Sequence, residues 1–188
     1  MTTGRPLRAD ARRNRDALLA KARELFAGGC FDMRFDDFAK LAGVGVGTLY
    51  RHFPTREALA EAVYREELTA ICAHGRELQA TLPAADALAT FLRGFVTHLF
   101  ANEGLARTLA TLMATHTGTL AEGGRELSQV LADLLAKGVD EGTVRADIGV
   151  GAVMTALQGI CVACGEPGSR ADADGTVTLV LDGLRHRG

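Results

Sequence analysis

Tryptophan is absent from these 188 residues, and the sequence has only four prolines and few other aromatic side chains. Only Pro83 and Pro167 lie outside the N-terminal region. Because proline interrupts helix interiors, its scarcity together with abundant Ala and Leu predicts an all-α protein. The hydrophobic fraction of 47% is ample for a packed core and argues against disorder.

Long hydrophobic runs are also missing, and none reaches the roughly 20 residues that a membrane-spanning helix needs. Residues 1–10 are polar and contain arginine, and no hydrophobic segment follows them, so they do not resemble a secretory signal peptide. We therefore expect a cytoplasmic protein with reduced thiols and no membrane partner.

The motifs of several enzyme classes are absent as well. The sequence contains no nucleophile elbow, no phosphate-binding glycine loop and no zinc-protease HExxH pattern. We predict no catalytic residue, no metal site and no cofactor, and we expect a protein that is not an enzyme.

Charge is distributed unevenly along the chain, although the net charge is only −2. Residues 1–56 contain 11 Lys and Arg against 6 Asp and Glu, a net charge of +5. Residues 57–188 contain 10 against 17, a net charge of −7. A basic N-terminal part is what contact with DNA phosphates requires, since their neutralisation supplies much of the affinity.

Residues 35–53, FDDFAKLAGVGVGTLYRHF, predict two short helices joined by a glycine turn. The apolar positions of the first helix recur at helical spacing on one face. Gly43 can end that helix because glycine adopts the left-handed conformation at low steric cost. The second helix covers residues 45–52 and is stopped by Pro54. This arrangement is a helix-turn-helix, whose second helix enters the DNA major groove.

The residues that resemble a known family are Ala39, Ala42 to Val44, Gly47 to Tyr50, and His52 to Leu59. Over about residues 10–65 the chain resembles the tetracycline-repressor (TetR) family of transcriptional regulators. Arg34 and Gly45 depart from the family pattern, which commonly has Ser or Thr at the first position and Ser at the second. The resemblance implies a three-helix DNA-binding domain at residues 1–54 and a helical effector-binding and dimerisation domain at residues 55–188.

Candidate DNA contacts come from the N-terminal arm, from the second helix of the motif and from the start of the next helix. Gly47 lets the backbone approach DNA, Thr48 offers a hydroxyl and a methyl group, and Arg51 suits a base or a phosphate. The rings of Tyr50 and His52 either present polar tips to phosphates or pack in the core. The full set is Arg5, Arg8, Arg34, Gly45, Gly47, Thr48, Tyr50, Arg51, His52 and Arg56.

The arm, residues 1–9, is expected to be flexible. It either reaches along the DNA backbone or is simply a solvated terminus. Residues 10–27 follow as the first helix. A long helix capped by Thr55 is predicted to run to about residue 80 and to link the two domains mechanically. Further helices are predicted at residues 86–102, 104–117, 122–139, 148–164 and 171–187.

The last two predicted helices suit a homodimer interface. The helix over residues 148–164 is apolar nearly all round, which suggests burial on two sides. A twofold pair would present two DNA-binding domains to half-sites ~34–36 Å apart or a multiple of that. We therefore expect a double-stranded DNA operator, a small-molecule effector and a second copy of the chain as partners.

An effector pocket is expected among the helices of the C-terminal domain, with mostly apolar walls and few polar groups. Its position follows from the family resemblance. The candidate lining residues are Phe91, Phe95, His98, Met113, His116, Met154 and Gln158.

Two other groups of residues allow different chemistry. His98 and His116, with Glu103 between them, could form a metal site or an acid–base pair. Cys161 and Cys164 form a C-x-x-C pair inside an apolar helix, where buried structural cysteine is common. Cys30 and Cys72 are single and are expected in the core.

The sequence therefore predicts a ligand-responsive transcriptional repressor, released from a palindromic operator by a small, partly apolar effector. The alternative is a metal- or redox-sensing protein, or an enzyme, that uses His98 and His116 or Cys161 and Cys164. A helix-turn-helix that contacts protein is a third possibility, which the basic N-terminal part disfavours.

Overall fold

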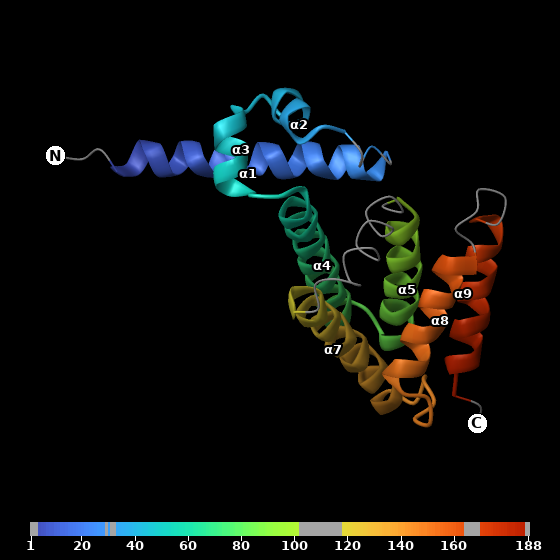
Figure 1. Cartoon of the computed structure of the whole chain (residues 1–188). Helices are drawn as coiled ribbons and strands as arrows, with labels where there is room; N and C mark the ends of the chain where they lie inside the picture. The colour runs from blue at the N-terminus through green and yellow to red at the C-terminus, as the bar shows by residue number, and fades with distance from the viewer. Residues whose placement is uncertain (1–3, 29, 31–32, 102–117, 164–169, 187–188) are drawn as a thin grey trace. The chain divides into compact units, whose positions relative to one another are not determined.

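The computed structural model describes residues 4–28, 30, 33–101, 118–163 and 170–186 (Figure 1). These residues are helical apart from turns and one isolated bridge between Val144 and Arg185, so the predicted all-α class is confirmed. The helices are α1 (Gly4–Ala27), α2 (Phe35–Leu41), α3 (Val46–His52), α4 (Arg56–Thr81), α5 (Ala84–Ala101), α7 (Gly118–Asp140), α8 (Val150–Ala163) and α9 (Arg170–Leu184). The helix predicted over residues 104–117 lies outside the described residues.

The N-terminal arm was the least accurate element of the prediction. The predicted flexible arm is wrong for residues 4–9, because α1 begins at Gly4. Pro6 is tolerated there, since the first turn of a helix has unbonded N–H groups in any case. Arg5 and Arg8 therefore belong to the first helical turns, and their side chains lie outside the described residues.

Two compact units make up the described chain, and the boundary between them falls after Glu66, inside α4. The predicted domain boundary at residues 54 and 55 stays a prediction. In the first unit, α1, α2 and α3 contact one another. Helices this short are marginal alone, so their apolar faces must pack together. The buried side chains are Leu18, Leu19, Ala22, Phe26, Phe38, Ala39, Val44, Leu49, Phe53, Leu59, Ala60 and Val63.

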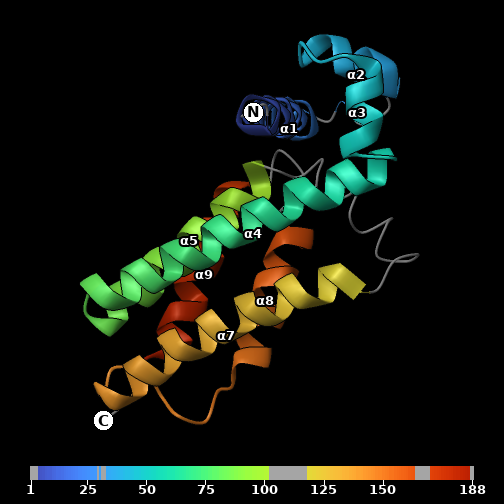
Figure 2. The same ribbon diagram turned by 90° about the vertical axis from the view of Figure 1, so that its left-hand side faces the viewer.

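The second unit contains the rest of α4 together with α5, α7, α8 and α9 (Figure 2). Helix α5 contacts α7, α8 and α9, and α8 contacts both α7 and α9. The central position of α5 explains its wide apolar face, on which Leu88, Phe91, Leu92, Phe95 and Val96 are all buried. Within the described ranges, none of the helices has the length and apolar character needed to span a lipid bilayer.

Gly75 sets how closely α4 approaches its neighbours in the second unit. A Cβ atom at this position would lie 2.6 Å from Cγ1 of Val130 on α7 and 2.7 Å from Cε2 of Phe91 on α5. Real Cβ atoms do not come so close to other carbons, so any larger residue would push the helices apart. Glycine at this position is therefore a packing requirement.

Candidate nucleic-acid interface and ligand pocket

The turn between α2 and α3 is closed by backbone hydrogen bonds. The N–H of Gly43 donates to the carbonyl of Lys40 at 3.1 Å, and the N–H of Val44 donates to the carbonyl of Ala39 at 2.9 Å. This pair of bonds is the Schellman motif, with Gly43 in the left-handed position at φ 68°. Val44 is buried directly after it and fixes the start of α3. The helix-turn-helix predicted from sequence is thus present with its glycine turn.

The N-termini of both motif helices lack a side-chain cap. Arg34 precedes α2, and its side chain makes no capping hydrogen bond. Gly45 precedes α3 and has no side chain that could cap it. Asp36 and Asp37 in the first turn of α2 compensate in part, because negative charge there is favourable to the helix dipole. Arg34 is exposed, so its guanidinium is accessible at the start of α2.

The start of α3 exposes glycine backbone. Gly45 and Gly47 are exposed, and no atom of the described residues lies within 4 Å of where a Cβ atom of Gly47 would be. Glycine inside a helix costs about 1 kcal/mol relative to alanine. Packing within the first unit does not require glycine at position 47, because a Cβ atom there would have open space. A close approach of the α3 backbone to an external surface does account for it.

Thr48, Arg51 and His52 follow the glycines on α3. Thr48 is half-buried, while Arg51 is exposed and its Nε donates to the carbonyl oxygen of Gly47 at 3.0 Å. His52 is half-buried, with its ring centroid 6.3 Å from that of Phe53. Phe53 itself is buried in the core beneath the guanidinium of Arg15. Arg51 is therefore an accessible cation at the end of α3.

Tyr50 has an exposed ring rather than a core position. Its hydroxyl donates to Oδ1 of Asp36 at 3.1 Å, and its ring packs edge-on against Phe35 at a centroid distance of 5.4 Å. The hydrogen bond to Asp36, with smaller effects from burial and the carboxylate charge, raises the pKa of Tyr50 above its ordinary value. In this conformation the hydroxyl proton is directed to Asp36, so a phosphate contact by Tyr50 requires that bond to open.

The start of α4 is fixed by two side chains. The N–H of Ala58 donates to Oγ1 of Thr55 at 3.1 Å, which confirms the predicted N-cap. Arg56 is half-buried, and its guanidinium donates to the backbone carbonyl of Met33. Arg56 therefore joins α4 to the segment before α2, a structural contact that the sequence pattern did not indicate.

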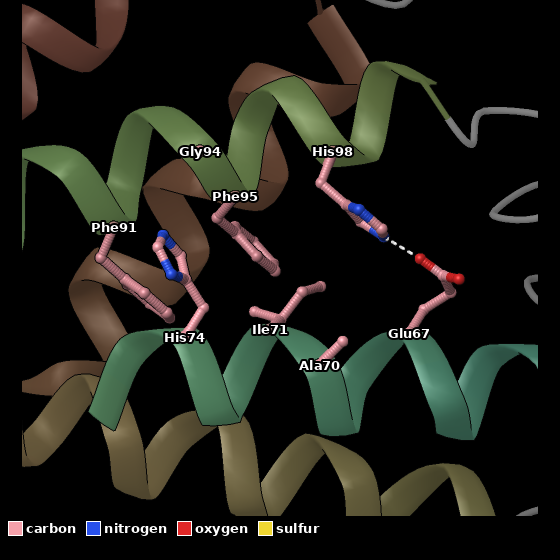
Figure 3. A pocket seen from close by; sticks show the side chains of 8 residues that line it. All are labelled: Glu67, Ala70, Ile71, His74, Phe91, Gly94, Phe95 and His98. Carbon is pink, nitrogen blue, oxygen red and sulfur yellow. Dashed lines mark ion pairs between the residues drawn. The ribbon is translucent and has the colours of Figure 1, made fainter. Parts of the chain in front are cut away.

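A pocket of about 210 Å³ lies between α4 and α5 in the second unit (Figure 3). Glu67 and His98 form an ion pair at one end, with Nε2 3.3 Å from Oε2. The rings of Phe91 and Phe95 are nearly parallel, with centroids 6.4 Å apart. The lining residues are Glu67, Ala70, Ile71 and His74 of α4, and Phe91, Gly94, Phe95 and His98 of α5.

The structure brings together part of the predicted effector site. Phe91, Phe95 and His98 line the pocket, whereas Met154 and Gln158 lie on α8 and are not among its lining residues. Met113 and His116 fall outside the described residues. The α4 side of the pocket was missed, although its residues follow the spacing i, i+3, i+4 and i+7 that marks one helix face.

The residues considered for other chemistry do not form a site within the described parts of the chain. No group of three metal-binding side chains occurs there. His116, Cys164 and the side chain of Cys161 lie outside them. Cys72 is buried as predicted, and burial raises the pKa of its thiol. The prediction that Cys30 lies in the core is wrong: this residue follows the end of α1 and is exposed.

Comparison with known proteins assigns both parts of the chain. Residues 18–63 match the family described as bacterial regulatory proteins of the tetR family. Residues 83–186 match the SbtR-like C-terminal domain of transcriptional regulators. Among curated proteins, a helix-turn-helix transcriptional regulator of Staphylococcus aureus is 39% identical over 61 residues, which cover 31% of this chain and 32% of that protein.

Solved structures extend the similarity to nearly the whole chain. A TetR transcriptional regulator from Streptomyces coelicolor is 37% identical, with a TM-score of 0.76 over 93% of this chain and 99% of that one. A TetR regulator from Mycobacterium vanbaalenii is 36% identical, with a TM-score of 0.69 over 96% and 99% of the two chains. These matches also support a regulator rather than an enzyme. The chain therefore belongs to the TetR family of bacterial transcriptional regulators and has an SbtR-like C-terminal domain.

Proposed function

We propose that this regulator is a homodimeric repressor that binds a palindromic DNA operator and is released from it by a small, partly apolar effector. The observation that carries the proposal is the exposed face of α3, where Gly47 has no side chain and no contact among the described residues requires its absence. Arg51 and His52 lie in the last turn of the same helix. A helix with a bare backbone and a basic end suits close entry into a DNA groove.

The charge distribution also supports DNA contact by the N-terminal part of the chain. Residues 1–56 carry a net charge of +5, while the remainder of the chain is acidic. The basic part includes all three helices of the first unit that contact one another. Phosphate contacts made by these side chains would make affinity fall steeply as salt rises.

Exposed apolar side chains on the last two helices support a dimer. Val162 on α8 is 84% exposed and Leu179 on α9 is 72% exposed, although α8 and α9 contact each other. Burial of these exposed apolar side chains against a second copy of the chain would be energetically favourable. A twofold pair would then present two α3 helices to the two halves of a palindrome.

The pocket supplies the effector part of the proposal. It opens between α4 and α5, and α4 is continuous with the segment that packs in the first unit. An effector that binds one conformation of α4 more tightly than another would shift the population toward it. Release of DNA follows if the favoured conformation no longer matches the spacing of the half-sites.

Selection from random double-stranded DNA, followed by titration of the enriched sequence at several salt concentrations, tests the proposal. We expect a near-palindromic consensus and an affinity that falls steeply with salt. Replacement of Arg51 by Ala should weaken binding by about 1–3 kcal/mol if it reads a base, and R51K should restore little of that loss. A folded dimer that enriches no consensus at any salt concentration would contradict the proposal.

A further inference from the structure

The pocket between α4 and α5 has one small residue on each wall, Ala70 on α4 and Gly94 on α5. Its walls are two matching helix faces with the same i, i+3, i+4, i+7 spacing, and the helices run antiparallel (Figure 3). Glu67 lies opposite His98 at one end, and His74 lies near Phe91 at the other. Ala70 and Gly94 belong to the middle of these faces, where larger side chains would fill the space.

Gly94 leaves this space open, in contrast to the glycine on the facing helix. A Cβ atom at Gly94 would meet no atom of the described residues within 4 Å, whereas one at Gly75 would collide with Phe91 and Val130. Gly75 thus lets the helices approach at one end, and Gly94 leaves room between them further along. The absence of a side chain at Gly94 is therefore not explained by tight packing.

The volume is sufficient for a small ring-shaped ligand. An apolar cavity of ~150 Å³ is enough to hold benzene. The pocket of about 210 Å³ is therefore large enough for one six-membered ring with a small substituent. The side chains of Ile71, Phe91 and Phe95 form apolar walls that suit a flat ring.

The polar end limits the chemistry of that substituent. Glu67 is only 14% exposed, and one of its carboxylate oxygens lies 3.3 Å from Nε2 of His98. An ionised carboxylate accepts hydrogen bonds and donates none. A ligand group that reaches Glu67 must therefore be a donor, such as a hydroxyl or an amino group.

We propose that the effector is a single-ring aromatic compound with one hydrogen-bond donor, of the size of phenol or aniline. The inference rests on the proposed effector role of this pocket. The ring lies against Ile71, Phe91 and Phe95, and the donor group binds the carboxylate of Glu67. Ala70 and Gly94 leave room for the ring because neither carries a large side chain.

Calorimetric and NMR titration of the full-length protein with phenol, aniline and toluene tests the proposal. Phenol and aniline should bind. Toluene has the ring without the donor, and its affinity should be lower by about tenfold or more. Glu67→Gln should weaken phenol binding and leave toluene binding unchanged. Failure of phenol and aniline to bind at millimolar concentration, or equal affinity for toluene, overturns the proposal.

Substitution at Gly94 locates the site. Gly94→Leu fills the pocket and should abolish phenol binding, while Gly94→Ala is the matched control that should retain it. Both variants should fold, because the position has open space. Unchanged phenol binding by G94L would place the ligand elsewhere and overturn the assignment.

These measurements need no DNA, so they separate this inference from the proposed function. If phenol binds as expected but does not release selected operator DNA, the inference on ligand class stands and the effector role fails. If a different compound releases the DNA and phenol does not bind, the proposed function stands and the ligand class is overturned.

Discussion

Glu66 and Glu67 are consecutive residues of α4, yet their carboxylates bind partners in different units. Oε1 of Glu66 lies 3.0 Å from NH1 of Arg15, and Oε2 lies 3.3 Å from NH2 of Arg23, both on α1. Glu67 pairs instead with His98 at the end of the pocket. Neighbours on a helix point about 100° apart, so one turn of α4 carries a contact to α1 and a contact to the pocket. We therefore expect a change at Glu67 to affect the turn that carries Glu66.

Glu66→Gln should uncouple effector binding from DNA binding. The glutamine keeps the size of the side chain but loses both charge-assisted contacts with α1. We expect the change in DNA affinity caused by the effector to shrink by about 1 kcal/mol, a large part of a typical coupling energy. Because the charged groups are about 40% exposed, stability should fall by no more than about 1 kcal/mol.

Fluorescence anisotropy of labelled operator, with and without saturating effector, measures the coupling. Glu61→Gln is the matched control, since Glu61 pairs with Arg65 one turn along the same helix rather than with α1. Wild-type coupling in E66Q, or an equal loss in E61Q, would contradict this role for Glu66.

Tyr50 should ionise later than an ordinary tyrosine because Asp36 accepts its hydroxyl proton. Its pKa is raised from the usual 10.0, so the folded protein favours the neutral phenol. The resulting stability is present at neutral pH and is lost as the pH rises past 10.0 and through the higher pKa of the folded state. Asp36→Asn should lower the pKa of Tyr50 toward its ordinary value.

Tyrosinate absorbance measures this pKa. The chain has only two tyrosines, so a Tyr64→Phe background leaves Tyr50 as the single signal. The Y64F protein that retains Asp36 gives the reference midpoint of the titration. If the midpoint does not move when D36N is added to this background, the hydrogen bond is absent in solution.

Gly75→Ala should destabilise the second unit. The added Cβ atom would lie 2.6 Å from Val130 and 2.7 Å from Phe91, so the helices must move apart. The overpacking cost outweighs the gain in helix propensity, and we expect a net loss of about 1–2 kcal/mol. Urea unfolding measures it. Gly94→Ala, in open space on α5, is the control and should gain about 0.5–1 kcal/mol. Equal stability of the two variants would contradict the packing role of Gly75.

Lys137→Met should also lower stability, because Lys137 holds the turn between α4 and α5. Its Nζ donates to the carbonyl oxygens of Gln79 and Leu82, each at 2.6 Å, and satisfies orphan acceptors at the end of α4. Four residues later, directly after the end of α7, Glu141 accepts from the N–H of Ala84 at the start of α5. Loss of two charge-assisted bonds should cost about 2 kcal/mol.

Chemical denaturation compares K137M with Lys40→Met. Lys40 pairs with Asp37, three residues away on the same helix, and both are exposed. Its removal should change the free energy of unfolding by less than about 0.5 kcal/mol. A K137M variant as stable as K40M would show that the turn does not depend on this lysine.

The helix-turn-helix was predictable because local signals determine it. Helix α2 covers Phe35–Leu41, inside the predicted stretch, and the left-handed Gly43 ends it as expected. Thr55 caps α4 for an equally local reason. The flexible arm was wrong for residues 4–9 because the start of a chain is expected to fray, whereas α1 begins at Gly4 and Pro6 is tolerated in its first turn.

The pocket was only partly predictable. On α5 the apolar face is wide, so Phe91, Phe95 and His98 stood out. On α4 the residues alternate among charged, small and apolar types, and no single apolar stripe marks the side that carries Glu67 and Ala70. Met154 and Gln158 were assigned to the same site from family resemblance, and α8 does not bring them to the described lining.

The sequence by itself determined the helices, the glycine turn and the uneven charge, because hydrophobic spacing, caps and composition act over a few neighbouring residues. The tertiary structure decided which small residues leave a hollow and which close a contact. Gly75 and Gly94 are the same residue type in adjacent helices, and only the packing of α4 against α5 makes one a point of contact and the other the wall of a pocket.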